Sequence, residues 1–250
     1  MKIALITGGS RGLGKNMATH LAKDGTAVIF TYHSNVKEAQ NVVAEVEKNR
    51  GRAHALQLDV SKSSTFAKFA EDLRAVLKDK FNTDSFDFLV NNAGTGLNAP
   101  VTSTTEEQFD ELMNIHLKGP YFLTQKLLPL MKDGGRILNV SSGLARFAVP
   151  GYSAYASMKG GIEVYTRYLA KELGPRKISV NVLAPGAIET DFGGGHTRDN
   201  PQANAFVSSV TALGRAGLPD DIGPVVVALL SEGTAWINGQ RIEASGGMFI

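Results

Sequence analysis

Short apolar runs alternate with amphipathic segments along most of the chain. The segment Lys37–Asn49, for example, places Val42 and Val46 on one apolar stripe, as a helix with one buried face does. Near-continuous apolar strands joined by helical crossovers predict a parallel sheet with helices on both faces, the doubly wound α/β fold. The predicted sheet has seven strands, at Ile3–Ile6, Ala27–Thr31, Ala53–Leu58, Phe86–Val90, Arg136–Val140, Ile178–Leu183 and Arg241–Ala244.

The composition is that of one globular domain, which we expect to span residues 1–250. Of the 250 residues, 43% are hydrophobic and 20% are charged, and there is no cysteine. The missing cysteines exclude disulfides, thiolate metal sites and a cysteine nucleophile. A net charge of +2 argues against a nucleic-acid partner. No apolar stretch reaches the roughly 20 residues that cross a bilayer, so we expect a cytoplasmic protein without membrane contact.

The alternating pattern breaks over about residues 187–202. Three consecutive glycines, Gly193 to Gly195, and the pair Asn200-Pro201 give this segment weak intrinsic order. A flexible lid over a substrate and an ordinary surface loop are both compatible with this composition.

A glycine-rich turn follows the first predicted strand. Thr7-Gly8-Gly9-Ser10-Arg11-Gly12-Leu13-Gly14 leads into a predicted helix over Lys15–Asp24. Glycines allow the backbone to approach a phosphate closely, and the start of a helix offers unpaired N–H groups and a positive dipole end. The order of strand, turn and helix therefore predicts a nucleotide-binding site.

The end of the second strand bears on the choice of nucleotide. An NAD-binding protein normally has an acidic residue there, to bind the ribose hydroxyls. The segment Phe30–Asn35 has no carboxylate, and Arg11 and Ser34 are suited to binding a 2′-phosphate. We therefore expect NADP(H) to be preferred over NAD(H). The alternative is that Arg11 is a solvated turn residue.

Tyr155 and Lys159 are candidates for acid–base chemistry. They lie four residues apart in a segment, Tyr152–Glu172, that should be helical, so they share one helix face. A lysine about 4 Å away is expected to lower the tyrosine pKa from its usual value of about 10. In isolation such a pair is usually a surface pair. Ser142, at the end of the fifth strand, favours the catalytic reading because strand ends face the ligand crevice.

The five histidines show no spacing typical of metal ligands, and no metal site is predicted. We interpret them as structural or solvated: they are His20, His33, His54, His116 and His196. His196, in the segment with weak order, is the best candidate among them for a substrate contact.

Taken together, these motifs resemble the short-chain dehydrogenase/reductase family. The turn Thr7–Gly14 matches that family's Thr-Gly-x-x-x-Gly-x-Gly pattern, and Asn91–Gly94 matches its Asn-Asn-Ala-Gly motif. Ser142, Tyr155 and Lys159 match its Ser and Tyr-x-x-x-Lys signature. The resemblance extends over essentially the whole chain and implies a single-domain Rossmann fold.

The resemblance implies a catalytic tetrad of Asn114, Ser142, Tyr155 and Lys159, without a metal. Tyr155 would give a proton to a carbonyl oxygen that Ser142 polarises, while hydride arrives from the nicotinamide. Lys159 would bind the nicotinamide ribose and tune Tyr155, and Asn114 would help to hold a water molecule. The implied cofactor contacts are Gly8, Ser10, Arg11, Gly12, Leu13, Gly14, Tyr32, Ser34, Asp59, Val60, Asn91, Ala93, Gly94, Tyr155, Lys159, Pro185, Gly186, Ile188 and Thr190.

The resemblance is strongest to the branch that contains 3-oxoacyl-carrier-protein reductases, because of the segments Pro185–Asp191 and Gly246–Ile250. Lys132 and Lys171 are candidates for docking an acidic carrier protein, but Asp133 counts against it. The sequence leaves the carbonyl or alcohol substrate open.

Two expectations concern assembly and the rival function. Members of the family commonly form dimers or tetramers through the helical segments that correspond here to Thr105–Met131 and Tyr152–Glu172, and Tyr165, Tyr168 and Leu169 are candidate contacts. The rival to an enzyme is a catalytically silent NADP(H)-binding sensor or scaffold on the same fold.

Overall fold

A computed structural model describes all residues, 1–250, and contains the predicted seven-stranded parallel sheet. The strand order across the sheet is β3-β2-β1-β4-β5-β6-β7, and all six pairings are parallel. The strands are β1 (Ile3–Ile6), β2 (Ala27–Tyr32), β3 (Ala53–Gln57), β4 (Phe86–Asn91), β5 (Met131–Val140), β6 (Ser179–Pro185) and β7 (Arg241–Ala244).

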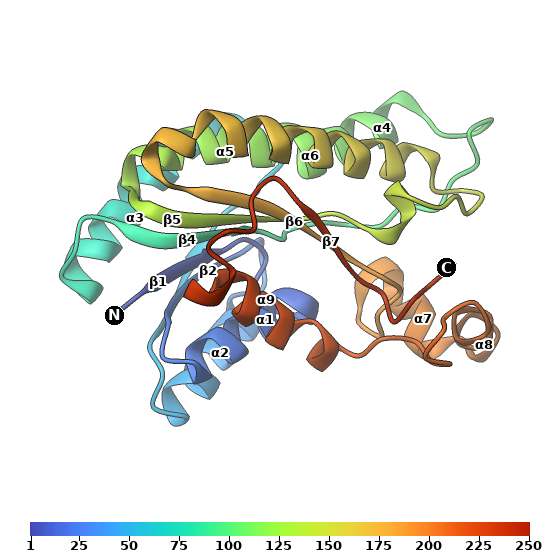
Figure 1. The fold of residues 1–250 in the computed structure, drawn as a ribbon, viewed down its shortest axis with the longest axis horizontal. Coiled ribbons are helices and arrows are strands. Elements are labelled where there is room, and N and C mark those ends of the chain that lie inside the picture. The colour runs from blue at the N-terminus through green and yellow to red at the C-terminus, as the bar shows by residue number, and fades with distance from the viewer.

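Helices cover both faces of the sheet, which confirms the doubly wound arrangement (Figure 1). One face carries α3 (Phe66–Phe81), α4 (Glu106–Met113), α5 (Gly119–Leu127) and α6 (Ser153–Glu172). The other carries α1 (Gly12–Lys23), α2 (Val36–Lys48) and α9 (Gly223–Leu230). Two short helices, α7 (His196–Asp199) and α8 (Pro201–Ser209), lie beside the C-terminal residues. None of the helices combines the length and apolar character that crossing a membrane requires.

The continuous apolar character of the strands is explained by two cores, one on each face. In β1, Ile3 and Leu5 pack into the core under α3, α5 and α6, whereas Ala4 and Ile6 pack into the core under α1, α2 and α9. Successive strand residues point to opposite faces, so a strand covered on both sides is mostly apolar at every position.

The strand order determines where a ligand crevice forms. The chain runs outward from β1 to β3 on one side, then returns to place β4 on the other side of β1. Loops that follow β1 and β4 therefore leave the sheet in opposite directions and open a crevice at the carboxyl ends of these strands.

Two predicted elements differ from the structure. Strand β5 begins at Met131 rather than Arg136, and its pairing with β4 shifts register between Phe86 and Phe88. The intervening residues include Gly134 with a positive φ, which gives room for this irregularity. The helical segment predicted over Thr105–Met131 is interrupted by a π-helical turn at Asn114–Lys118.

Residues 187–202 contain short helical pieces rather than an open loop. A 3₁₀ turn at Phe192–Gly195 leads directly into α7 and then α8. Gly193, Gly194 and Gly195 all have positive φ angles. Only glycine adopts this backbone freely at three successive positions, so the sequence pattern reflects a sharp change of chain direction.

A ladder of buried amides connects the central strands to the helices above them. Asn91 of β4 donates to Asn139 of β5 over 2.8 Å and to Thr124 of α5 over 3.1 Å. Asn139 in turn donates to Thr166 of α6 over 2.9 Å. These bonds fix α6 relative to the strand ends, because a buried amide is costly when it has no partner.

Replacing Asn139 by alanine should lower the free energy of unfolding by about 1–3 kcal/mol, since two buried hydrogen bonds are lost at a fully buried position. Urea denaturation measures this change. The matched control is Asn49→Ala, an exposed residue at the end of α2, where we expect less than about 0.5 kcal/mol. Equal effects of the two substitutions would contradict the role given to the ladder.

Candidate active site

The turn between β1 and α1 lies against the turn that follows β4. A β-carbon on Gly8 would lie 2.9 Å from the Cα atom of Ala93, and Gly8 has a φ of +68°. A β-carbon on Gly14 would overlap the carbonyl oxygen of Gly8. The glycines predicted from the phosphate-binding pattern are therefore required by backbone packing, and they leave the turn free of side chains.

Hydrogen bonds hold the same two turns together. The Thr7 hydroxyl oxygen accepts from the backbone N–H groups of Asn92 and Ala93, each over 2.9 Å. The Asn92 side chain donates to the carbonyl oxygens of Thr7 and Gly8, over 2.9 and 3.2 Å. Thr7 and Asn92 thus hold the two turns that border the crevice at a fixed distance. In the sequence analysis these residues appeared only as parts of longer motifs.

The start of α1 has the features of a phosphate site. Arg11 precedes the helix and makes no capping hydrogen bond with its side chain, and the first turn contains no acidic residue. The N–H groups of this turn and the positive end of the helix dipole therefore face the crevice without a protein anion to neutralise them. Thr190, from the segment after β6, lies beside Gly12. This arrangement fits a dinucleotide phosphate.

Of the residues expected to contact the adenosine end, Tyr32, Ser34 and Asp59 lie at or just after the ends of β2 and β3, and Arg11 lies in the turn after β1. Tyr32 is half-buried, whereas Ser34 and Arg11 are exposed. Asp59 accepts hydrogen bonds from the Ser61 N–H and hydroxyl groups, and its other oxygen lies 3.6 Å from Nε2 of His33. Asp59 therefore joins the two strand ends that border this part of the crevice.

Not every predicted cofactor residue has a side chain in the crevice. The Asn91 side chain bonds Thr124 and Asn139 inside the protein, so it supports the crevice from beneath. Pro185 is buried at the end of β6, and Ile188 pairs with Gly217. Of the remaining positions, Leu13 lies in the first turn of α1, and the others lie on the turns that surround the carboxyl ends of the strands: Ser10, Val60, Gly94 and Gly186.

Helix α6 and strand β5 bring three of the four predicted catalytic residues together. Tyr155 and Lys159 are 7% and 5% exposed, and the Lys159 Nζ atom lies 5.5 Å from the centre of the Tyr155 ring. Lys159 donates to the carbonyl oxygen of Val140 over 2.8 Å. Ser142 follows Val140 by two residues, and its side chain acts to lower the pKa of Tyr155.

The electrostatics of this pair differ from the sequence expectation. Burial raises the pKa of Tyr155 well above its usual value, and the Ser142 side chain opposes this only in part. Burial also lowers the pKa of Lys159 to about 7. The expectation that Lys159 lowers the tyrosine pKa is therefore wrong for the protein without ligand, because loss of water acts on both groups more strongly than their mutual attraction.

Charged side chains around Ser142 fix its backbone. Arg241 of β7 donates to the Ser142 carbonyl oxygen over 3.3 Å and to a carboxylate oxygen of Glu163 over 2.8 Å. The same Glu163 oxygen accepts from the Ser141 hydroxyl over 2.8 Å. Glu163 lies on the helix that carries Tyr155, so this network connects the serine loop to the tyrosine helix.

Asn114, the fourth predicted catalytic residue, is less closely connected to this group. It is half-buried at the first position of the π-helical turn, and its side chain makes no hydrogen bond within the protein. His116, two residues later, is the side chain that contacts Tyr155: the two ring centres are 5.1 Å apart and the rings are nearly perpendicular. The sequence interpretation of His116 as structural or solvated missed this contact.

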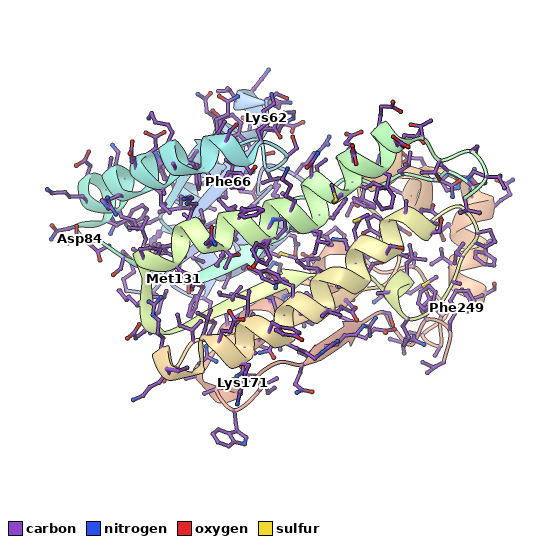
Figure 2. All side chains as sticks on the ribbon, turned by 90° about the horizontal axis from the view of Figure 1, so that it is seen from above. Lys62, Phe66, Asp84, Met131, Lys171 and Phe249 are labelled. Atoms are coloured by element: carbon purple, nitrogen blue, oxygen red, sulfur yellow. The ribbon has the colours of Figure 1, made fainter.

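Two side chains of the segment 187–202, Phe192 and His196, are candidates for contact with a substrate. Phe192 is 48% exposed and its ring centre is 6.0 Å from that of Tyr155, whereas His196 is exposed at the start of α7. Figure 2 shows Lys171 and Met131 at one end of the molecule and Phe249 at the other. Lys132 and Lys171 therefore lie away from the carboxyl ends of the strands, which contradicts their suggested part in docking a carrier protein beside the crevice.

Comparisons with known proteins agree with this site. A family model described as enoyl-(acyl carrier protein) reductase matches residues 8–249. The hydroxynaphthalene reductase-like protein Arp2 of Metarhizium brunneum is 35% identical, over 98% of this chain and 94% of its own length.

Two solved structures share the whole fold. LugOII, a promiscuous reductase that catalyses keto-reduction at C1 during lugdunomycin biosynthesis, is 37% identical with a TM-score of 0.94, over 100% of this chain and 98% of its own. The angucycline C-6 ketoreductase LanV, solved with bound NADP, is 35% identical with a TM-score of 0.94, over 99% and 95% of the two chains. The chain thus belongs to the short-chain dehydrogenase/reductase family, as an NAD(P)-dependent oxidoreductase that interconverts a carbonyl group and an alcohol.

Proposed function

We propose that Tyr155 is the general acid of carbonyl reduction in this enzyme, and the base of the reverse reaction. The observation that carries this proposal is the burial of Tyr155 and Lys159 side by side, next to Ser142, at the crevice. A tyrosine with a raised pKa keeps its proton at neutral pH, which a proton donor requires.

The protein groups act on the carbonyl oxygen. When bound, the reduced nicotinamide supplies the hydride that adds to the carbonyl carbon. The O–H bond of Tyr155 breaks as its proton passes to the carbonyl oxygen, to which Ser142 donates a hydrogen bond. A phenolate remains on Tyr155, and the ammonium group of Lys159 stabilises it in a site of low dielectric constant.

We further propose that the preferred cofactor is NADP(H). Arg11 is exposed beside the glycine turn, and no carboxylate stands at the end of β2 to repel a 2′-phosphate. The NADP bound to LanV supports the same choice.

The proposed substrate is a planar aromatic ketone. The names of the relatives, a hydroxynaphthalene reductase-like protein and an angucycline ketoreductase, refer to fused aromatic rings. In this chain, Phe192 lies beside Tyr155, and Phe249 packs between Phe147 and Phe206, with ring centres 4.7 and 6.4 Å away. Phe192 immediately precedes the three glycines with positive φ, so we propose that residues 187–202 act as a lid that presses Phe192 onto the substrate.

Replacing Tyr155 by phenylalanine should reduce turnover of a bicyclic aromatic ketone, such as a tetralone, at least about a hundredfold, because the proton donor is lost. NADPH oxidation measures turnover, and fluorescence titration should show unchanged NADPH binding. Tyr165→Phe is the matched control: Tyr165 lies on the same helix and burial also raises its pKa, but its hydroxyl donates to the backbone carbonyl of Tyr121. A Tyr155→Phe protein with wild-type turnover would sink the proposal, and a wild-type protein that binds NADPH but reduces no ketone would favour the silent sensor.

Replacing Arg11 by alanine should raise the dissociation constant of NADPH about tenfold and leave that of NADH unchanged, since only NADPH has the 2′-phosphate. Fluorescence titration with each cofactor makes the comparison. Arg74→Ala, which removes an exposed arginine from α3, controls for the change in net charge. If wild-type protein binds NADH more tightly than NADPH, the proposed preference is wrong.

We also propose that the enzyme is a homo-oligomer, a dimer or a tetramer, assembled through α5 and α6. These helices lie next to each other, and Tyr121 of α5 packs on Tyr165 of α6 with ring centres 4.7 Å apart. Phe122, Val164 and the 65% exposed Tyr168 add apolar surface on the same helices, a patch typical of interfaces. Leu169, named from the sequence as a candidate contact, is buried in the core instead.

The double substitution Phe122→Glu with Tyr168→Glu should convert the oligomer to a smaller species, because it places charge in the apolar contact. Sedimentation velocity measures the change. Val36→Glu, at an exposed apolar residue of α2, is the control that should leave the mass unchanged. A wild-type protein that sediments as a monomer would contradict the proposal.

A further inference from the structure

His116 lies in the widest turn of the helical segment between α4 and α5. The π-helical turn Asn114–Lys118 replaces regular helix there, and such turns are frequent at functional sites. The turn brings the imidazole into the protein, where its side chain is 2% exposed. Gly119 closes the turn against the Val60 carbonyl oxygen, a place where a β-carbon would overlap that oxygen.

The two ring nitrogens of His116 have different surroundings. Nε2 lies 2.8 Å from the carbonyl oxygen of Thr95 and 3.3 Å from the Thr95 nitrogen. The shorter contact assigns the proton to Nε2, which donates to the carbonyl oxygen. Nδ1 is then an acceptor, and it is buried without any hydrogen-bond partner. A buried acceptor without a partner destabilises the folded protein by about 1–3 kcal/mol, so we expect Nδ1 to have a functional role.

The imidazole touches both halves of the active site. Its ring stands nearly perpendicular to the Tyr155 ring, at an angle of 84°. A β-carbon on Gly94 would lie 2.8 Å from Cε1 and 3.3 Å from Nδ1 of His116. Nδ1 therefore belongs to the edge that faces the turn after β4, which borders the crevice expected to hold the cofactor.

The ring is neutral. Burial lowers the pKa of His116 well below its usual value, and the charge of Lys159 lowers it further, while the Thr95 carbonyl opposes both. The titratable groups that face it are Tyr155 and Lys159 of α6, and the turn after β4 contributes none. A neutral imidazole leaves the Nδ1 lone pair free to accept a hydrogen bond.

We propose that His116 is a positioning residue of the reduction site, which fixes the ring of Tyr155 and presents Nδ1 as an acceptor to an O–H donor that enters with the cofactor. The donor is a ribose hydroxyl or a water molecule. The side chain of Asn114, which the sequence resemblance places in the catalytic tetrad, makes no hydrogen bond with Tyr155. This inference rests on Tyr155 being the proton donor.

Four variants separate the contributions of the ring and of its two nitrogens. His116→Asn keeps a polar group near Nδ1, His116→Gln keeps one near Nε2, His116→Phe keeps only the ring, and His116→Ala keeps neither. We expect kcat to fall about a hundredfold in His116→Ala and about tenfold in His116→Phe and His116→Gln, and to recover in His116→Asn to within about threefold of wild type. Urea denaturation of each variant shows whether it is folded.

The dissociation constant of NADPH distinguishes the two donors. If a ribose hydroxyl bonds Nδ1, the constant should rise about tenfold in His116→Phe but not in His116→Asn. If a water molecule does, binding should be unchanged and only kcat should fall. His54→Asn is the control, because His54 is a half-buried histidine of the edge strand β3, away from the crevice, and should alter neither quantity.

Two results would overturn the inference: wild-type kcat and cofactor binding in His116→Phe, or a His116→Asn protein no more active than His116→Phe. Loss of turnover in Tyr155→Phe together with either result would leave the proposed proton donor intact and remove only the role of His116. Should the variants fail to fold, nitrogen NMR of the wild-type protein decides. The Nδ1 resonance of His116 should shift on addition of NADPH, and an unchanged resonance would contradict the inference.

Discussion

The close contact between the turn after β1 and the turn after β4 is the constraint on which the rest of the site depends. Gly8 meets Ala93 without space for a side chain, and Thr7 and Asn92 bond the two turns together. Because β1 and β4 are neighbours in the sheet, this contact holds together the two turns at their carboxyl ends. The proposed dinucleotide site at the start of α1 and the proposed reaction site beside β5 then lie on one continuous edge of the sheet.

Burial at that edge determines the chemistry. Removal of water raises the pKa of Tyr155 well above its usual value and lowers that of Lys159 to about 7, so at neutral pH Tyr155 keeps its proton and Lys159 is partly protonated. A neutral tyrosine is ready to give its proton to a carbonyl oxygen. In the proposed reaction Tyr155 becomes a phenolate, which a protonated Lys159 would stabilise strongly because the site has a low dielectric constant.

The supporting polar residues hold these groups at fixed positions. The amide ladder from Asn91 through Asn139 to Thr166 attaches α6 to the sheet, and Arg241 joins the Ser142 loop to Glu163 on the same helix. Tyr155 and Lys159 therefore move with the strand ends rather than with solvent-exposed loops. Functional side chains that are supported in this way by rigid elements keep the geometry that their chemistry requires.

The fold and the local motifs could be predicted from the amino-acid sequence. Strands that are apolar almost throughout indicate a sheet covered by helices on both faces. The four-residue spacing of Tyr155 and Lys159 places both side chains on one face of a helix, independently of the surroundings. The irregular start of β5 at Met131 was not predictable, because pairing with β4 compensates a Gly-rich stretch that locally indicates a turn.

The identity of the aromatic neighbour of Tyr155, His116, follows from the packing of distant segments. Local pattern carries no signal for the π-helical turn that brings His116 against a tyrosine 39 positions later in the chain, nor for the contact with Gly94 that leaves Nδ1 unpartnered. The pKa values of Tyr155 and Lys159 were likewise decided by tertiary structure, because they follow from the water that packing excludes rather than from the spacing of the two residues.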